Sequence, residues 1–371
     1  MIPLTPVNTL TINILVDNCI EWMTKLPPGF SHEIRQQLGG TPPIDEETGV
    51  AIVDLEHYCC GAHGFSALIT TEVEGQGSQT ILFDTGPDSK TIIRNIEALK
   101  VPVHSIERVV ISHWHADHTG GLLSFLDYRG SRTSNSPNMP ISIDLHPDRP
   151  VARGIAPPPS YDNVIGRLPA DPTFEAIEKG LTRERTTDVR GRIELHSEGH
   201  VIANKTAYVS GLIPRVSDFE GGLLGSVRWT ETADGAWKWI AEEHILDERY
   251  VAVDVIGKGL ILFSACSHAG ICNVVRDAVE NFKRPIHMIV GGLHLAGPEL
   301  ASRIPKTVQF LTESLRPAPV YVLPMHCSGF AVKIALEHAL GEGCVPAGVG
   351  TKIVVQGDAL AETKIFEPSI L

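Results

Sequence analysis

The sequence lacks the features that define several large classes of protein. Seven cysteines in 371 residues are too few for a disulfide framework, and their odd number leaves at least one unpaired. No basic residue precedes Lys25, and the apolar stretch 10–16 is interrupted by Thr11 and Asn13, so we expect neither a signal peptide nor a membrane span. These absences predict a reducing compartment, with the cytoplasm as the default location.

An excess of positive charge is also missing. The chain has 31 Lys and Arg against 44 Asp and Glu, a formal net charge of −13, and no local basic patch. Because nucleic acids are bound mainly through Lys and Arg, we expect a small-molecule substrate and neither nucleic acid nor a membrane as a partner. The composition, 43% hydrophobic and 20% charged, is that of an ordinary globular protein. We expect one domain over residues 1–371, and the sequence leaves the oligomeric state open.

Short apolar runs bounded by Gly, Pro or Asp predict strands that alternate with helices. The predicted strands are residues 9–16, 65–73, 79–86, 107–112, 249–266 (two strands), 285–292 and 319–326. The predicted helices are residues 89–99, with Asp88 or Ser89 as its N-cap, 271–282 and 299–315. Apolar strands alternating with helices indicate α/β sheets covered by helices.

The middle of the chain has a different character. Seven prolines fall within residues 147–192, which disfavours a sheet there. We therefore predict that residues 128–248, approximately, are an insertion that covers the active-site edge instead of building the core.

The strongest motif directly follows the predicted strand 107–112. It reads His113-Trp114-His115-Ala116-Asp117-His118 and is followed by two glycines that allow a tight turn into a helix. His113 and His115 can point to one side, while Asp117 and His118 can face a second position nearby. Imidazole and carboxylate groups suit one or two divalent ions; zinc is the expected metal, with iron or manganese as alternatives.

Three more histidines, His268, His294 and His326, follow apolar strands of the second half. A single histidine at a strand end is more often a packing or loop residue than a ligand. The shared placement favours a site, because strand ends at the same edge of an α/β sheet converge.

Taken in this order, these segments resemble the metallo-β-lactamase superfamily, and within it the branch named 7,8-dihydropterin-6-yl-methyl-4-(β-D-ribofuranosyl)aminobenzene 5′-phosphate synthase. The segments that carry the resemblance are ILVDN (14–18), AHGFS (62–66), LFDTG (82–86), SHWHADHTGGL (112–122), GLIPRVSDFE (211–220), ACSHAGICN (265–273), GGLHL (291–295) and PMHCSG (324–329).

The resemblance implies a four-layer αββα sandwich of two mixed sheets with a metal centre at one edge. It implies that one metal is bound by His113, His115 and His268, and the other by Asp117, His118 and His326. It places Asp84 behind them, orienting ligands through hydrogen bonds. Superfamily hydrolases often have a bridging Asp, but residues 264–273 contain no carboxylate. A water bridge, a weak second site, Asp254 or another acid, and a mononuclear centre all stay open.

A metal with an open position lowers the pKa of its bound water and supplies hydroxide. Asp117 can then accept and return the proton, and His294 is either a donor to the substrate oxyanion or a pocket wall. His63 and Asp17, with Asn18, either line the pocket or stabilise a loop. Arg215 either holds a substrate phosphate or carboxylate or pairs with Asp218 or Glu220.

Cys266 and Cys327 lie within two residues of presumed ligands, but cysteine is commonly buried as a small apolar residue. The favoured function is a hydrolase that uses metal-bound hydroxide on an ester, lactone or phosphoester of a small molecule. The alternatives are an iron-dependent oxidoreductase on the same ligands, a pterin-phosphate synthase or transferase, and a binding protein with a vestigial site.

Overall fold

In the computed structural model, which describes residues 2–132, 140–182 and 191–371, two large sheets pack face to face. The eight-stranded sheet has the order β2-β19-β1-β3-β4-β5-β6-β9, and the six-stranded sheet has the order β10-β11-β14-β15-β16-β18. The pairs β4/β5, β5/β6, β6/β9, β15/β16 and β16/β18 are parallel and the others are antiparallel. Both sheets are therefore mixed, as predicted.

The strands of the first sheet are β1 (Thr9–Val16), β2 (Phe30–Ser31), β3 (Ser66–Glu72), β4 (Gln79–Phe83), β5 (Ile106–Val110), β6 (Ile141–Leu145), β9 (Gly191–Leu195) and β19 (Lys352–Gln356). Those of the second are β10 (His200–Ile202), β11 (Ala207–Val209), β14 (Val251–Val255), β15 (Gly259–Ser264), β16 (Ile286–Gly292) and β18 (Tyr321–Met325). A small sheet joins β7 (Ala152–Ile155), β8 (Gly166–Arg167), β12 (Ser226–Glu231) and β13 (Trp237–Ala241), and β17 (Leu315–Arg316) pairs with β20 (Ser369–Ile370).

The helices are α1 (Glu33–Gly39), α2 (Ser89–Ala98), α3 (Ala116–Thr119), α4 (Leu122–Ser131), α5 (Phe174–Leu181), α6 (Ile271–Phe282), α7 (Ile304–Gln309), α8 (Phe330–Leu340) and α9 (Ala359–Glu362). Asp88 caps α2 as predicted, because its side chain accepts hydrogen bonds from the backbone of Lys90 and Thr91. The predicted helix 299–315 is divided into a 3₁₀ segment (Pro298–Arg303), α7 and a π turn (Phe310–Ser314). None of the helices in the described ranges is long and apolar enough to cross a bilayer.

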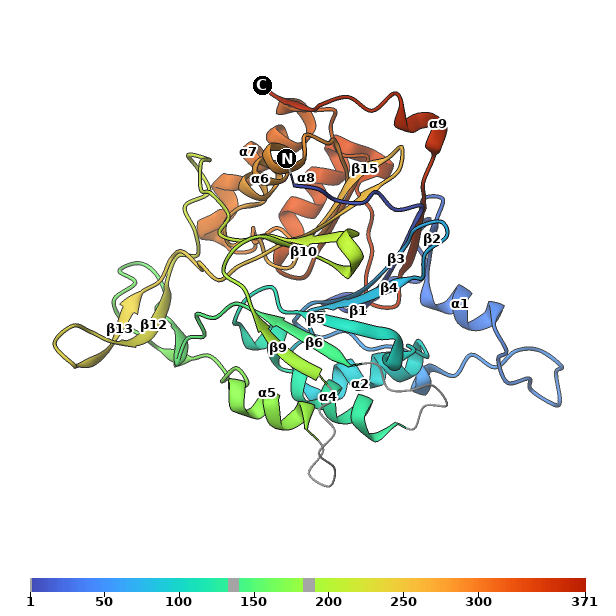
Figure 1. Cartoon of the computed structure of the whole chain (residues 1–371), viewed down its shortest axis with the longest axis horizontal. Coiled ribbons are helices and arrows are strands. Elements are labelled where there is room, and N and C mark those ends of the chain that lie inside the picture. The colour runs from blue at the N-terminus through green and yellow to red at the C-terminus, as the bar shows by residue number, and fades with distance from the viewer. Residues whose placement is uncertain (1, 133–139, 183–190) are drawn as a thin grey trace.

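Three buried apolar clusters hold four layers together. The central cluster joins the facing sides of the two sheets and includes Phe83 and Phe263. A second cluster packs α6, α7 and α8 on the six-stranded sheet, and a third packs α2, α4 and α5 on the eight-stranded sheet. The order helices, sheet, sheet, helices is visible in Figure 1. The predicted αββα sandwich is thus present, since each sheet buries one face on the other and one face under helices.

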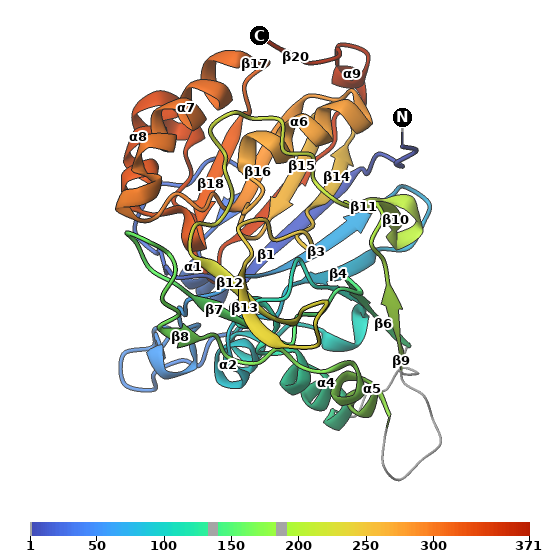
Figure 2. The ribbon, with the colours of Figure 1, turned by 90° about the vertical axis from the view of Figure 1, so that its left-hand side faces the viewer.

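The stretch 128–248 does more than cover the site. Its strands β6 and β9 extend the eight-stranded sheet, and β10 and β11 extend the six-stranded one, so the prediction that it stays outside the core is wrong for these strands. The expectation of no sheet among the prolines is also wrong: β7 forms between Pro150 and Pro157, which flank it without occupying it. The small sheet β13-β12-β7-β8 lies at the side that faces the viewer in Figure 2. The boundary of an insertion stays a prediction.

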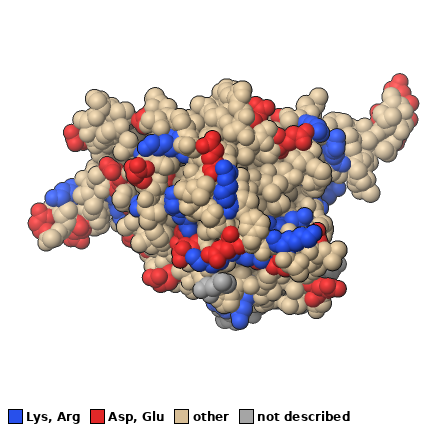
Figure 3. Space-filling model, turned by 90° about the horizontal axis from the view of Figure 1, so that it is seen from above, with Lys and Arg blue, Asp and Glu red and all other residues tan. Residues whose placement is uncertain are grey.

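The surface seen in Figure 3 carries charges of both signs side by side. Acidic and basic side chains are intermingled across this face, and no continuous basic area is seen there among the described residues.

Candidate metal centre

The candidate metal ligands and their neighbours lie directly after parallel strands, at one edge of the sandwich. Asp84 follows β4, the histidine motif follows β5, Cys266 and His268 follow β15, and His326 follows β18. Because the carboxyl ends of parallel strands lie at the same sheet edge, these segments meet although they are far apart in sequence. The structure brings all six predicted ligands together in two neighbouring groups.

The first group consists of His113, His115 and His268, whose ligand atoms lie within 4.8 Å of one another. All three side chains are buried. His113 Nε2 lies 3.0 Å from His115 Nδ1, and the His268 ring is 4.8 Å from that of His113 between centroids. Three converging imidazoles are a known ligand set for catalytic zinc.

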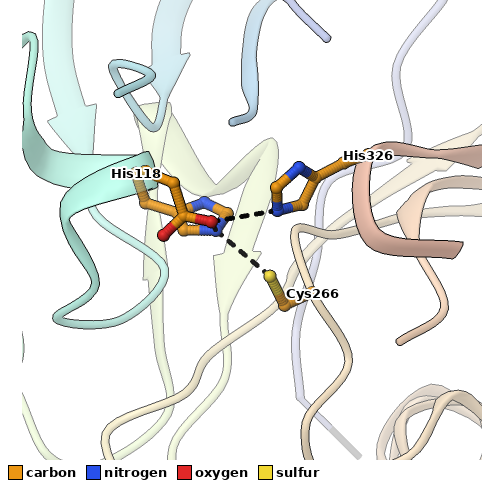
Figure 4. A group of neighbouring side chains, drawn as sticks. His118, Cys266 and His326 are labelled. Carbon is orange, nitrogen blue, oxygen red and sulfur yellow. Dashed lines mark hydrogen bonds and ion pairs between the residues drawn. The ribbon is translucent and has the colours of Figure 1, made fainter. Parts of the chain in front are cut away.

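The second group consists of Asp117, His118, Cys266 and His326 (Figure 4). His118 Nε2 lies 3.1 Å from Cys266 Sγ and 3.5 Å from Asp117 Oδ2. His326 Nε2 lies 3.3 Å from the same Asp117 oxygen, yet it is buried and makes no hydrogen bond. A buried nitrogen without a hydrogen bond, next to a carboxylate and a thiol, fits a metal ligand better than a packing residue.

Burial and neighbouring imidazoles hold the pKa of His113 and of His115 well below the usual range. Both rings are therefore neutral at pH 7 and have a free lone pair for a cation. Burial alone would lower the pKa of His118, but Asp117 and Asp84 outweigh it and raise that pKa to about 9. Since a ligand histidine must be neutral, a cation that binds the second group displaces a proton.

Two carboxylates behind the ligands, those of Asp84 and Glu248, fix the orientation of the ligands. Asp84 accepts hydrogen bonds from His118 Nδ1 at 2.7 Å and from the backbone N and Oγ of Ser112, both at 2.7 Å. Glu248 accepts from the backbone N–H groups of His268 and Ala269, each at 2.7 Å. Each bond directs a ring or a loop toward the centre, which is the usual role of outer partners at metal sites.

The Asp84→Asn variant is expected to bind zinc about 10- to 100-fold more weakly, because an amide cannot accept all the donors that orient His118 and Ser112. Competition with a chromogenic chelator measures the affinity. Asp88→Asn is the matched control: Asp88 caps α2, and Asn is an equally good N-cap, so its zinc affinity should equal that of the wild type. Equal affinity in Asp84→Asn would contradict the predicted role of Asp84.

The remaining predicted residues lie at different distances from the centre. His294 lines the pocket, and its ring is 4.5 Å from that of His268. His63 stands at the same pocket with its side chain 69% exposed, and its Nε2 is 3.7 Å from Asp117 Oδ2. Asp17 is buried and accepts the backbone N–H of His326 at 2.7 Å, so it positions a loop and does not line the pocket.

Arg215 and Asp254 belong neither to the two ligand groups nor to the lining of the pocket. The Arg215 guanidinium donates to the His268 carbonyl oxygen at 3.1 Å and is not among the residues that line the pocket, so it supports a ligand loop. Asp254 is ion-paired with Arg284 at 3.0 Å and belongs to neither group. The alternative that Asp254 supplies the bridge is therefore wrong, because its carboxylate is already bound elsewhere.

Several backbone positions at the centre have unusual conformations. Asp84, Ser267, His294 and His326 all have positive φ angles, between 44° and 63°. Such conformations are unfavourable for residues other than glycine, and they concentrate at functional sites. They arise here because the chain must turn sharply after each strand to aim a side chain at the shared edge.

The two glycines after the motif act through close packing. A Cβ at Gly120 would lie 2.0 Å from the Pro87 oxygen, and one at Gly121 would lie 2.2 Å from the Thr85 oxygen. Their φ angles, −62° and −87°, are open to any residue. The predicted helix does follow, since α4 begins directly after Gly121, but neither backbone conformation requires glycine. The missing Cβ atoms instead let the motif pack against the loop of Asp84.

A pocket of about 460 Å³ opens onto the centre. Its floor contains His115, Asp117, Cys266, His268 and His326. Its other walls are mostly apolar and come from the segments 154–155, 168–169 and 223–226, which include parts of the small sheet. Among the described lining residues none is Lys or Arg. A larger pocket of about 1080 Å³ lies between the segment 19–30 and α8 and contains none of the residues of the two groups.

Two residues of the centre were missed or given little weight by sequence reasoning. Cys266 stands inside the second group, although its sequence suggested a small buried residue. Glu248 supports His268, but nothing in the sequence near position 248 marks it. The spacing Cys266-x-His268 after a strand is the one signal that pointed to the cysteine.

Comparisons with known proteins agree with this geometry. Residues 64–200 match the model of the metallo-beta-lactamase superfamily. The chain is 27% identical over 270 residues to the 7,8-dihydropterin-6-methyl-4-(beta-D-ribofuranosyl)-aminobenzene-5′-phosphate synthase of Methanocaldococcus jannaschii, which covers 72% of this chain and 81% of that protein. An uncharacterized protein of the same organism is also 27% identical over 270 residues, 72% of this chain and 84% of its own length.

Among solved structures, the chain is similar to Tm1679, described as a metal-dependent hydrolase of the β-lactamase superfamily. The TM-score is 0.61, the identity is 19%, and the match covers 94% of this chain and 99% of that one. The predicted fold is thereby confirmed.

Proposed function

We propose that this protein is a metal-dependent hydrolase of a small-molecule ester, lactone or phosphoester, because residues 64–200 match the model of the metallo-beta-lactamase superfamily and the chain has that fold. The observation that carries the proposal is the pair of adjacent buried ligand groups at the bottom of a pocket. A fold by itself does not specify a reaction, so the proposal depends on this site.

The donors fit one or two divalent ions. His113, His115 and His268 would hold one, and Asp117, His118 and His326 would hold the other. When bound, such ions lower the pKa of a coordinated water and polarise a carbonyl or phosphoryl oxygen. Zinc is the metal that this mixture of imidazole and carboxylate favours, although iron and manganese accept the same groups.

The protein's own residues divide the remaining work. Burial alone would raise the pKa of Asp117, but His118 and His326 hold it well below the usual range. A carboxylate with so low a pKa is a weak base, so it serves better as a ligand than as the proton acceptor. Partial desolvation at the pocket mouth and the neighbouring His326 lower the pKa of His63, which is therefore a neutral base at pH 7 and can exchange protons with solvent.

His294 is placed to donate a hydrogen bond to the substrate. Its ring lines the pocket beside His268, and its Nδ1 is buried without a hydrogen-bond partner. Burial alone would lower its pKa, but Cys327 and Glu248 raise it, which favours the protonated, donating form. We propose that it stabilises the charge that develops on the substrate oxygen.

The pocket walls favour a substrate with an apolar part. Ile155, Leu168, Leu223 and Leu224 face the centre from the covering segments. A separate phosphate group would find no cationic Lys or Arg side chain to pair with among the described lining residues. This favours an ester or lactone over a substrate with a separate phosphate group.

A second candidate, a synthase or transferase acting on a phosphorylated pterin, rests on the relative named as a pterin-phosphate synthase. That relative is 27% identical over 72% of this chain, a similarity that leaves the reaction open. The absence of a cationic phosphate clamp among the described lining residues is the observation against it.

Metal analysis combined with a substrate panel tests the proposal. We expect one or two zinc equivalents per chain and chelator-sensitive turnover of p-nitrophenyl esters, lactones or bis-p-nitrophenyl phosphate. Bound iron with oxygen-dependent turnover would overturn the hydrolase and support the oxidoreductase. A rise in melting temperature with a phosphorylated pterin, without hydrolysis of any panel member, would support the synthase instead.

A further inference from the structure

The pocket between the segment 19–30 and α8, which we call the second pocket, has no part in the function proposed above. Its volume is about 1080 Å³, and its lining also includes Arg35 of α1 and residues from the segment 341–347. Small-molecule sites typically have volumes of about 300–1000 Å³. The second pocket is therefore large enough to hold a small organic molecule.

Part of the lining of the second pocket is apolar. Leu26 and Phe30 come from the segment 19–30, Pro324 comes from β18, and Val345 and Ala347 come from the chain that follows α8. The last three are buried, so they form a fixed surface beneath the pocket. Because apolar surfaces associate by releasing water, this part of the lining suits an aliphatic or aromatic body of a ligand.

Two cationic side chains of the lining have no carboxylate partner. Lys333 of α8 is half-buried, and the one hydrogen-bond contact described for its Nζ is with Cys19 Sγ, at 3.8 Å. Arg35 makes no ion pair or side-chain hydrogen bond within the described ranges. Burying part of a charged side chain without a counter-ion costs free energy. An anion in the second pocket would offset that cost at Lys333.

The carboxylates of the lining are mostly engaged elsewhere. Glu342 is paired with Lys25 at 2.7 Å, and both side chains are exposed. Glu21 accepts two backbone N–H groups of its own loop, at 2.7 and 2.9 Å. Glu337 is the lining carboxylate that has no such contact among the described residues, and it is exposed. Two free cations against one free carboxylate favour an anionic ligand over a cationic one.

The second pocket and the metal centre share the segment 17–19. Asp17 is buried, and its two oxygens accept the backbone N–H of Cys19 at 2.8 Å and that of His326 at 2.7 Å. Asn18 Oδ1 lies 3.2 Å from His326 Nδ1. Cys19 lines the second pocket, whereas His326 belongs to the second ligand group. A molecule that contacts Cys19 and Pro324 therefore touches the chain on both sides of this link.

We propose that the second pocket binds a small organic anion and that its occupancy strengthens metal binding at the centre. The anionic group pairs with Lys333, Arg35 adds positive charge within the same pocket, and the apolar body lies on the apolar part of the lining. A bound molecule holds Cys19 in place and, through Asp17, the loop of His326. A ligand loop that is already ordered loses less entropy when a metal binds. The effect on the metal rests on the proposed metal-dependent function, whereas the binding of the anion does not.

Anilinonaphthalene sulfonate is a fluorescent probe with this chemistry, a sulfonate on an aromatic body. We expect saturable binding to the wild type and about 10-fold weaker binding to Lys333→Met, because a hydrogen bond to a charged group is lost. Lys306→Met is the matched control: Lys306 also lies on a helix and contacts the Phe219 ring at 5.2 Å, but it does not line the second pocket. Its affinity should equal that of the wild type. Equal affinity in Lys333→Met overturns the proposal.

Cysteine alkylation locates the probe on the unmodified chain and so guards against a variant that fails to fold. Cys19 is exposed and lines the second pocket, while Cys60 is partly exposed and lies outside it. After brief treatment with iodoacetamide, peptide mass spectrometry should show that saturating probe slows the alkylation of Cys19 several-fold and leaves that of Cys60 unchanged. Unchanged alkylation of Cys19 at saturation overturns the site.

Reciprocity tests the link to the metal centre. If occupancy strengthens metal binding, zinc must strengthen the binding of the probe by the same factor. Read from the protection of Cys19, the affinity for the probe should be at least about 5-fold higher in the zinc-loaded chain than in the chelator-treated chain. Equal affinities overturn the coupling. Protection of Cys19 in a chain that binds no zinc supports the anion site and overturns the metal-dependent function, so the two failures are distinguishable.

Discussion

The His115→Ala variant is expected to lose metal-dependent hydrolysis by at least about 100-fold in kcat/KM. His115 contributes to the three-histidine group and also lines the pocket. Without its imidazole, two protein ligands remain in that group. Changes to residues that merely orient ligands already cost about 10- to 100-fold, so removing a ligand should cost more.

Turnover of a p-nitrophenyl ester, bound metal per chain and circular dichroism are measured together. His57→Ala is the control, since His57 is 77% exposed on its side chain and pairs only with nearby Asp54 among the contacts described for it. The control should match the wild type in all three measurements. Full turnover in a folded His115→Ala variant would show that this group of histidines does not carry the reaction.

The Arg153→Met variant is expected to lower the free energy of unfolding by about 3–5 kcal/mol. Arg153, on β7, is 2% exposed; its guanidinium pairs with Asp247 at 2.6 Å and with Glu242 at 2.7 Å, and it donates to the Trp114 carbonyl oxygen at 2.7 Å. Its loss leaves the Asp247 carboxylate buried beside an apolar side chain. Since Asp247 also accepts the Trp114 backbone N–H at 2.7 Å, the histidine motif itself loses support.

Arg228→Met is the matched control for this buried pair. Arg228 lies directly opposite Arg153 on β12, but it is 20% exposed; it pairs with Asp148, which is 52% exposed, and at 3.3 Å with Glu242. A pair near the surface contributes about 0–1 kcal/mol, so urea denaturation should separate the two variants clearly. Equal losses of unfolding free energy in the two variants would contradict the prediction that the buried Arg153 pair stabilises the fold more than the exposed Arg228 pair.

The pH dependence gives an independent check on the same pair. Burial alone would raise the pKa of Asp247, but Arg153 outweighs it and lowers the pKa in the folded protein. A lowered pKa stabilises the fold above the ordinary carboxyl pKa, and the contribution is lost as pH falls through the lowered value. In Arg153→Met, burial raises the pKa of Asp247, and at low pH the carboxyl group becomes neutral. A neutral carboxyl group costs less free energy to bury than a carboxylate. The deficit of Arg153→Met should therefore shrink as pH falls from 7 toward 4.

Much of the fold was predictable from local patterns. Strand β1 and helix α6 begin and end at the predicted residues, because their apolar periodicity is regular and unbroken. The helix expected at 299–315 is divided by a 3₁₀ segment at its start and a π turn at its end. The apolar pattern of the sequence gave no sign of either. The proline-rich stretch was misjudged, since a proline excludes a strand only at its own position.

The candidate site was predictable where its residues are adjacent in sequence and hidden where they are not. Cys266 and Glu248 lie near the centre because strand ends converge, and no spacing in the sequence measures that convergence. The supporting pair of Arg153 and Asp247 joins two segments of the stretch predicted as an insertion, so it was likewise invisible.

By itself, the sequence determined the ligand types. The cluster from His113 to His118 places three imidazoles and a carboxylate within six consecutive residues, and the side chains of so short a segment must lie close together. Only the tertiary structure decided which distant groups complete each site, which carboxylates orient them, and which apolar segments close the pocket. The reason is that parallel strands align their carboxyl ends whatever the length of chain between them, so contacts across the shared edge depend on strand order and not on sequence separation.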